Sequence, residues 1–202
     1  MFTGIVEEVG TLVVREDQSD SAVLQIRADR VLEGVALGDS IAVNGVCLTV
    51  TGVTDDVWST DVMAETLSRS SLGSVSAGAA VNLERAVTPH TRLGGHLMQG
   101  HVDGVGSIVS RTPGEHWEVV RVALPPQLAR YVVEKGSIAV DGVSLTVSAV
   151  SAPDDDQPWF EVSLIPTTLR ETTLGARAPG APVNLEVDVI AKYVERLLGG
   201  AR

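Results

Sequence analysis

The sequence has 202 residues, of which 44% are hydrophobic, 20% are charged and only 3% are aromatic. A chain of this length can bury two modest cores, which Val, Leu, Ile and Ala must fill. The net charge of −11 and the lack of a dense run of Lys or Arg exclude a typical nucleic-acid-binding protein. The single cysteine, Cys47, cannot form an internal disulfide, so we expect a reducing, cytoplasmic location.

The N-terminal segment MFTGIVEEVG lacks the basic and apolar regions of a targeting peptide. No uninterrupted apolar run in the sequence approaches the roughly 18 residues that a membrane span needs. We therefore expect neither a targeting segment nor a membrane partner.

The same blocks recur in the same order in both halves of the chain. GIVEEVG at 4–10 matches GHVDGVG at 100–106, and SIAVNGVCLTV at 40–50 returns as SIAVDGVSLTV at 137–147 with nine of eleven positions unchanged. The blocks TLSRSSLG and TLRETTLG follow, and then two copies of VNLE. A period near one hundred residues suits a small domain rather than a solenoid unit. The sequence thus predicts two homologous domains.

Each half reads as a series of short strands. Segments such as AVLQIRA, VCLTVTGV and VWSTDVM alternate or are rich in β-branched residues, and turn residues separate them. Asn44-Gly45 and Asp141-Gly142 predict hairpin turns at equivalent places. About six strands per half, with a short helical turn at 66–73 and 168–175, favour a closed barrel over an open sandwich, because closure removes exposed sheet edges. The second half is lengthened at the loop SAPDDDQPW.

A linker and a C-terminal helix complete the expected layout. The stretch AVTPHTRLGGH, with Pro89 and two glycines, reads as a linker of modest length. We expect a first domain with its linker at 1–96, a second domain at 97–188 and a helix at 189–202.

The expected helix has one apolar face. Asp188 can cap its N-terminus, and these apolar residues share a face at helical spacing: Ile190, Tyr193, Val194, Leu197 and Leu198. A helix this short is marginal alone, so the face must pack, either on its own barrel or on another copy of the chain. We favour an oligomer.

Differences between the halves are candidates for chemistry. Asn44 corresponds to Asp141, and Cys47 corresponds to Ser144. A thiol has a pKa of about 8.5 and is strongly nucleophilic, whereas a serine hydroxyl needs an adjacent base. The alternative for Cys47 is a small buried core residue.

Two threonines and two histidines add to the candidates. Thr49 and Thr146 lie two residues beyond Cys47 and Ser144 and so point the same way, although β-propensity alone also explains them. His96 and His101 do not read as a metal site, because no Cys or Asp ligands accompany them at zinc spacing.

Two further polar positions break the repeat. His101 replaces Ile5, and Lys135 replaces Gly38. A polar residue in place of an apolar one suggests a difference between two sites. Lys135 also has a plainer explanation as a solvated residue at a strand end.

The assembled motifs resemble the alpha chain of riboflavin synthase. The resemblance rests on MFTGIV, NGVCLTV, GGHLMQGHV, KGSIAVDGVSLTV, LIPTTLRETTLG and the duplicated VNLE, and it runs from Met1 to about Leu198. It implies two six-stranded Greek-key β-barrels in tandem, an all-β fold completed by a C-terminal α-helix that holds a homotrimer. It also implies dismutation of two 6,7-dimethyl-8-ribityllumazine molecules to riboflavin and 5-amino-6-(ribitylamino)uracil, with no cofactor and no metal.

The resemblance also implies where the reaction occurs and what takes part. Two substrate molecules lie between the first barrel of one subunit and the second barrel of a neighbour, and a lumazine synthase is a possible partner. Two similar pockets would hold two copies of one flat ring face to face. The implied catalytic residues are Cys47, Ser144, Thr146, His101, Lys135 and Asp188. The implied substrate-binding residues are Phe2, Thr3, Gly4, Ile5, Val6, Ser40, Cys47, Leu48, Thr49, Val62, Met63, Ala64, Glu65, Thr66, Gly100, His101, Val102, Lys135, Ser144, Leu145, Thr146, Leu164, Ile165, Pro166, Thr167 and Thr168.

Several assignments stay open at this stage. Asp188 matches an acidic position of the family's active site, but a helix cap explains it equally well. We expect a base ordered by Ser144, Thr146 and His101 to remove a proton from the 7-methyl group of one lumazine, whose carbanion then attacks the other. Two alternative functions are a non-catalytic lumazine or flavin carrier or antenna of the same fold, and a barrel-based interaction module, which would need a basic groove and stacking aromatics that the chain lacks.

Overall fold

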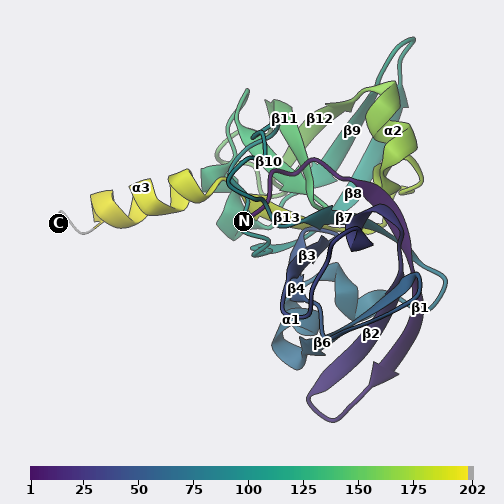
Figure 1. Ribbon diagram of the computed structural model, residues 1–202. Helices are drawn as coiled ribbons and strands as arrows, with labels where there is room; N and C mark the ends of the chain where they lie inside the picture. Colours follow the sequence, from purple (N-terminus) through teal and green to yellow (C-terminus); the bar gives the residue numbers. More distant parts are fainter. Residues whose placement is uncertain (200–202) are drawn as a thin grey trace.

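The computed structural model describes residues 1–199 of the chain. Two β-barrel domains pack against each other, and a C-terminal helix projects from the second (Figure 1). Within the described residues, no helix is long and apolar enough to cross a membrane. The expectation of an all-β fold with two six-stranded barrel-like domains and a C-terminal helix is confirmed.

The first domain contains strands β1 (Glu8–Asp17), β2 (Ser21–Arg27), β3 (Ser40–Val43), β4 (Val46–Thr49), β5 (Gly52–Thr54), β6 (Val57–Met63) and β7 (Ala80–Arg85). Its short helices are the 3-10 turn η1 (Arg30–Leu32), α1 (Ala64–Arg69) and η2 (Ser71–Ser74). The strand order is β4-β3-β7-β1-β2-β6-β5. The strands at the two ends, β4 and β5, follow each other in the chain with only Val50 and Thr51 between them, so the sheet curls into an interrupted barrel.

The second domain is a closed barrel with strand order β10-β11-β12-β9-β8-β13. Its strands are β8 (Gly104–Pro113), β9 (Glu118–Ala123), β10 (Ser137–Val140), β11 (Val143–Val150), β12 (Trp159–Leu164) and β13 (Pro182–Val187). The helical turns are η3 (Pro126–Tyr131), α2 (Pro166–Glu171) and η4 (Thr173–Gly175). The continuous strand β11 takes the place of β4 and β5 of the first domain.

Each barrel has its own apolar core, produced by alternation of buried and exposed residues along its strands. The largest core side chains, Trp58 in β6 and Phe160 in β12, occupy repeat-equivalent positions and are fully buried. Each barrel core thus contains one fully buried aromatic side chain, and aliphatic side chains fill the remainder.

The expected hairpin turns form, and they also meet. Asn44 and Asp141 each have φ 46°, and Gly45 and Gly142 each have φ 79°, as expected for turns in which both central residues are left-handed. A Cβ atom on Gly45 would lie 2.8 Å from the backbone nitrogen of Gly142. Glycine is thus required for the turn and for the contact between the barrels.

Two asparagines from the VNLE blocks tie the barrels together around this contact. The Asn82 amide Nδ2 donates to the carbonyl of Asp141, and the Asn184 Nδ2 donates to the carbonyl of Asn44, at 2.8 and 2.9 Å. All four side chains are buried. The Asn44 and Asp141 difference therefore lies at the interface between barrels and not in a pocket.

The C-terminal helix α3 (Val189–Gly199) is capped by Asp188, whose Oδ1 accepts a hydrogen bond from the Ile190 backbone N–H at 2.9 Å. Its polar side contacts its own barrel, because Lys192 pairs with Asp103 and Glu195 pairs with Arg130. The helix was expected over 189–202; residues 200–202 lie outside the described residues.

Candidate active site

Two loops cross between the barrels. Phe2 and Met98 form an isolated antiparallel bridge, with the Phe2 N–H donating to the Met98 carbonyl at 2.8 Å. Beyond this bridge, the Gly4 carbonyl accepts from the Ser144 N–H, and the Gly100 carbonyl accepts from the Cys47 N–H, both at 2.8 Å. The N-terminal loop of the first barrel therefore lies on the second barrel, and the loop that leads into the second barrel lies on the first. In Figure 1 the N-terminus accordingly lies beside β10 and β13.

The crossing continues into the cores. Val6 packs against the core of the second barrel, and Val102 packs against the core of the first. Each pocket thus contains residues from both repeats of one chain.

The first pocket is a hollow of about 220 Å³ beside Cys47. The side chains of Cys47 and Thr49 lie on the outer face of β4, whereas Val46, Leu48 and Val50 point into the barrel core. The hollow is lined by Val46, Cys47, Glu65, Thr66, Arg69, Ser70, Gly100, His101 and Val102. The start of α1 and the crossed loop therefore enclose the only thiol of the chain.

Neighbouring strands add hydroxyl groups on the same outer faces. Ser40 pairs with Thr49 across β3 and β4, and Ser137 pairs with Thr146 across β10 and β11. Thr49 and Thr146 are both exposed. Each barrel thus presents a row of small polar side chains next to its crossed loop. Their hydroxyl groups can form hydrogen bonds with the donors and acceptors of a polar ligand.

The equivalent position of the second barrel is Ser144, which lies beneath the N-terminal loop and whose surroundings are called the Ser144 site. The Ser144 Oγ lies 2.7 Å from the His96 Nδ1. A Cβ atom added to Gly4 or to Gly95 would lie within 2.8 Å of the Ser144 side chain, so the loops on both sides approach closely. Within one chain, Ser144 is therefore accompanied by His96, whereas His101 lies with Cys47.

His96 is buried, and within the part of the chain that the structure describes its Nε2 has no hydrogen-bond partner. Burial lowers the pKa of His96, and the nearby charge of Asp188 opposes this shift. The neutral imidazole therefore dominates at pH 7 and can accept the Ser144 hydroxyl proton through Nδ1. Asp188 acts both as the helix cap and as a charge close to His96.

Lys135 is held in an unusual backbone conformation. Its φ is 65°, and its N–H donates to the Val147 carbonyl at 2.8 Å, as the Gly38 N–H donates to the Val50 carbonyl at 2.9 Å in the first barrel. A lysine in the left-handed region costs about 1 kcal/mol relative to glycine. The side chain is exposed and free to reach a ligand.

The other expected binding residues differ in how far their side chains are exposed. Phe2, Leu48, Val62 and Leu164 are buried in apolar clusters, so only their backbone can face a ligand. Thr3 and Gly4 are also buried, in the crossed loop. The half-buried residues are Val6, Thr66, Val102, Leu145 and Thr168, and the exposed ones are Ile5, Met63, Ala64, Glu65, Ile165, Pro166 and Thr167.

Sequence reasoning missed Val46, Arg69 and Ser70, which line the hollow beside Cys47, and His96, which lies beside Ser144. His96 was weighed only as a metal ligand, and the matched repeat blocks begin at Gly100, four residues later. No local pattern pairs His96 with Ser144, which lies 48 residues further along the chain. Across residues 1–199, no group of three or more His, Cys, Asp or Glu side chains is placed to hold a metal ion.

The fold and the pockets define a protein of two tandem ligand-binding barrels. The family model of the lumazine binding domain matches residues 3–86 and 99–188, one copy on each barrel. LumP in complex with 6,7-dimethyl-8-(1′-D-ribityl)lumazine has a similar structure, with a TM-score of 0.82 and 26% identity over 93% of this chain and 99% of that chain.

Two relatives show which family of lumazine-binding proteins the chain belongs to. The riboflavin synthase of Mycobacterium tuberculosis (strain ATCC 25618 / H37Rv) is 61% identical over 202 residues, the full length of both chains. The riboflavin synthase of Actinobacillus pleuropneumoniae is 49% identical over 98% of this chain and 90% of its own length. The chain belongs to the riboflavin synthase family.

Proposed function

We propose that this chain catalyses the dismutation of two 6,7-dimethyl-8-ribityllumazine molecules. One molecule transfers a four-carbon unit to the other, which yields riboflavin and 5-amino-6-(ribitylamino)uracil. The full-length 61% identity to a riboflavin synthase carries this proposal. The transfer rearranges carbon between two identical molecules, so it needs no external oxidant or reductant.

The two sites support unequal roles for the two substrates. Cys47 and His101 line one hollow, and at the equivalent place of the second barrel Ser144 is paired with His96. We assign to the Ser144 and His96 pair, with Thr146, the ordering of the base that removes the 7-methyl proton. Cys47 is assigned to the partner substrate, where a thiol assists addition at the ring carbon. Lys135 is assigned to the ribityl chain or to the developing charge.

Oligomerisation is part of the same proposal. The apolar face of α3 is exposed, with Leu197 at 75% and Leu198 at 70% of their full accessibility. We propose that α3 holds a homotrimer in which the first barrel of one subunit faces the second barrel of the next. A cytoplasmic location and association with a lumazine synthase are further proposals, the former supported by the single free thiol. The division at 1–96 and 97–188 remains our proposed domain boundary.

The alternative function is a non-catalytic lumazine or flavin carrier. The likeness to LumP keeps this function in view, but at 26% identity it is the weaker match.

One assay separates the two functions. The purified protein is incubated with 6,7-dimethyl-8-ribityllumazine alone, and riboflavin formation is followed by absorbance and fluorescence. We expect riboflavin and the pyrimidine product in equal amounts. Tight binding without product would support the carrier, and no binding would contradict both functions. Ser144→Ala should lose turnover, whereas Ser110→Ala on the exposed part of β8 serves as the matched control.

A further inference from the structure

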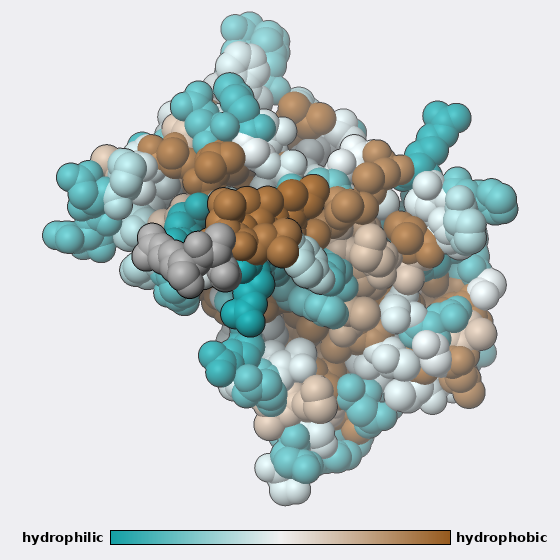
Figure 2. All heavy atoms as spheres, turned by 90° about the vertical axis from the view of Figure 1, so that its left-hand side faces the viewer, coloured by the Kyte–Doolittle hydropathy of each residue, from teal (hydrophilic) through white to brown (hydrophobic). Residues whose placement is uncertain are grey.

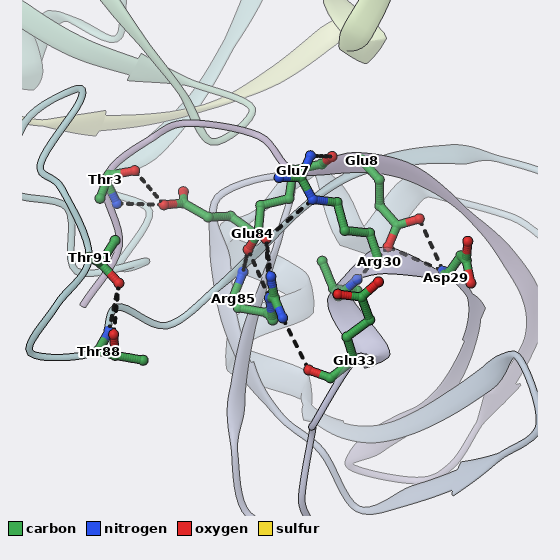
Figure 3. A network of polar contacts seen from close by, with 11 residues as sticks. Thr3, Glu7, Glu8, Asp29, Arg30, Glu33, Glu84, Arg85, Thr88 and Thr91 are labelled. Carbon is green, nitrogen blue, oxygen red and sulfur yellow. Dashed lines mark hydrogen bonds and ion pairs between the residues drawn. The ribbon is translucent and has the colours of Figure 1, made fainter.

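Two buried glutamates hold the crossed loops. Glu186 in β13 accepts hydrogen bonds from the backbone N–H groups of Gln99, Gly100 and His101, at 2.7, 3.0 and 3.0 Å. Glu84 in β7 accepts from the Thr3 N–H, the Thr3 hydroxyl and the Gly4 N–H, at 2.6, 2.7 and 2.9 Å. Figure 3 shows the Glu84 carboxylate directed at Thr3. Both are the last residue of a VNLE block, so the arrangement is repeated.

These carboxylates are held by the loops alone. Glu84 is 5% exposed and Glu186 is 2% exposed, and no ion pair to either occurs among residues 1–199. Burying a charge is costly, and here the hydrogen-bond donors of the loops offset the cost, helped at Glu186 by the charge of Lys192. Burial raises the pKa of both carboxyl groups, while the loop N–H donors oppose that shift. Two such costly groups at equivalent places indicate a role that an apolar residue could not fill.

The loops that they hold cover the reactive side chains of the opposite barrel. Gly100, bonded to Glu186, also accepts the Cys47 N–H, and a Cβ atom on Gly100 would lie 2.7 Å from the Cys47 Cβ. Gly4, bonded to Glu84, accepts the Ser144 N–H. A carboxylate on one barrel therefore sets the position of the loop over the other barrel's pocket.

We propose that Glu84 and Glu186 are positioning residues that act across the barrels, Glu186 on the loop over Cys47 and Glu84 on the loop over Ser144. The inference rests on the proposed function for its relevance to the reaction, because it determines how the two substrates are held. Its structural content does not depend on turnover. A general stabilising role would loosen both pockets alike, whereas crossed positioning loosens one pocket in each variant.

The single cysteine makes the first pocket measurable. In the native protein, the rate at which 5,5′-dithiobis(2-nitrobenzoic acid) modifies the thiol reports on Cys47 alone. We expect Glu186→Gln to raise this rate about tenfold, because an amide cannot accept all three N–H donors and the covering loop is released. Glu84→Gln is the matched control and should leave the rate unchanged. Equal rates in all three proteins, or equal increases in both variants, would overturn the proposal.

Moving the thiol from position 47 to position 144 should reverse which glutamine variant is labelled faster. In the double variant Cys47→Ser with Ser144→Cys, the thiol lies in the Ser144 site, and Glu84→Gln should now raise the labelling rate while Glu186→Gln should not. A melting temperature that falls in both glutamine variants without this crossed pattern would show a structural role only and would contradict the proposal.

A measurement on the wild-type protein covers the case in which a variant does not fold. The amide hydrogens of Gly4, Gly100 and His101 should exchange with solvent far more slowly than that of the exposed linker residue Leu93. Exchange as fast as that of Leu93 would exclude loops that are held by these carboxylates. None of these measurements requires riboflavin to form, so failure of the catalytic proposal is recognised separately by the lumazine assay.

Discussion

His96 shows how burial prepares a residue for proton transfer. Its pKa is lowered by burial, its Nδ1 lies 2.7 Å from the Ser144 Oγ, and its Nε2 has no hydrogen-bond partner among residues 1–199. A neutral imidazole in this position raises the basicity of the serine oxygen. Cys47, at the position equivalent to Ser144, contacts no histidine of its own chain at hydrogen-bond distance among the described residues. Because a thiol ionises more readily than a hydroxyl, it needs such a base less.

We expect His96→Asn to lower kcat by about a hundredfold, because asparagine keeps a hydrogen-bonding group near the Nδ1 position but cannot take a proton. The wild-type rate should fall as the pH drops through the lowered pKa of His96, since protonation removes the base. The variant should lack this acid limb. A pH profile of kcat for both proteins tests this, with His90→Asn in the exposed linker as the control. An unchanged kcat and an unchanged acid limb would remove His96 from the mechanism.

At the scale of elements, β7 and β13 supply the side chains that join the two barrels and the side chains that bind the crossed loops. Their asparagines bridge to the hairpin turn of the opposite barrel, and their glutamates hold the loops. One difference interrupts this symmetry. Asp141 forms an ion pair with Arg177 at 2.9 Å, whereas Asn44 stands at the equivalent position and Val75 aligns with Arg177. Only the second barrel therefore places a charged pair at the interface.

The buried carboxyl group of Asp141 makes the free energy of unfolding depend on pH. Burial raises the pKa of Asp141 from 3.8 to about 6, although Arg177 opposes the shift. Because the folded pKa is raised, the contribution of Asp141 is fully present below pH 3.8 and is lost as the pH rises to about 6. Relative to Asp141→Asn, the wild-type free energy of unfolding should thus decrease by up to about 1.4 kcal/mol per pH unit in this window.

Urea unfolding of both proteins between pH 4 and 7 measures this difference. The reverse substitution, Asn44→Asp, provides the matched comparison, because the first barrel offers Val75 and no arginine at the equivalent place. It should destabilise the protein more at pH 7 than at pH 4, since the buried carboxylate is unpaired. A difference between wild type and Asp141→Asn that is constant with pH would rule out a raised Asp141 pKa.

At the scale of the whole molecule, α3 is attached by its polar side and leaves its apolar side uncovered. Lys192 and Glu195 contact the second barrel, while the exposed hydrophobic residues are Ile190, Tyr193, Val194, Leu197 and Leu198. Figure 2, turned to face the side from which α3 projects, shows hydrophobic surface gathered there. In the single chain this apolar face is exposed, so it does not pack on its own barrel.

We expect Leu197→Glu to convert a trimer into single chains of 21.2 kDa, because a buried charge at a helix interface is costly. Turnover should fall with the trimer, since the proposed site needs the neighbouring barrel. Light scattering after gel filtration measures the mass, and the lumazine assay measures turnover. Arg196→Glu introduces the same residue at an already charged position of α3 and serves as the control. A variant that stays active as a single chain would contradict the intersubunit site.

The repeat in the sequence was sufficient to predict two barrels, their hairpin turns and the small polar residues that share one face of β4 and of β11. These features depend on local patterns: alternation along a strand, Asn-Gly or Asp-Gly at a turn, and small polar residues on one face of β4 and β11. Asp188 caps α3, as the local sequence predicts, whereas its proximity to His96 is a tertiary feature that no local pattern indicates.

The tertiary structure alone decided how these local features combine. The sequence does not indicate that Gly4 lies over Ser144 and Gly100 over Cys47, nor that His96 pairs with Ser144, because these contacts join segments 48 residues or more apart. They arise when two barrels close and meet at Gly45 and Gly142, which brings each loop onto the other barrel. The sequence by itself determined two similar barrels that differ at Cys47 and Ser144, and packing between the barrels decided which residues surround each of these two side chains.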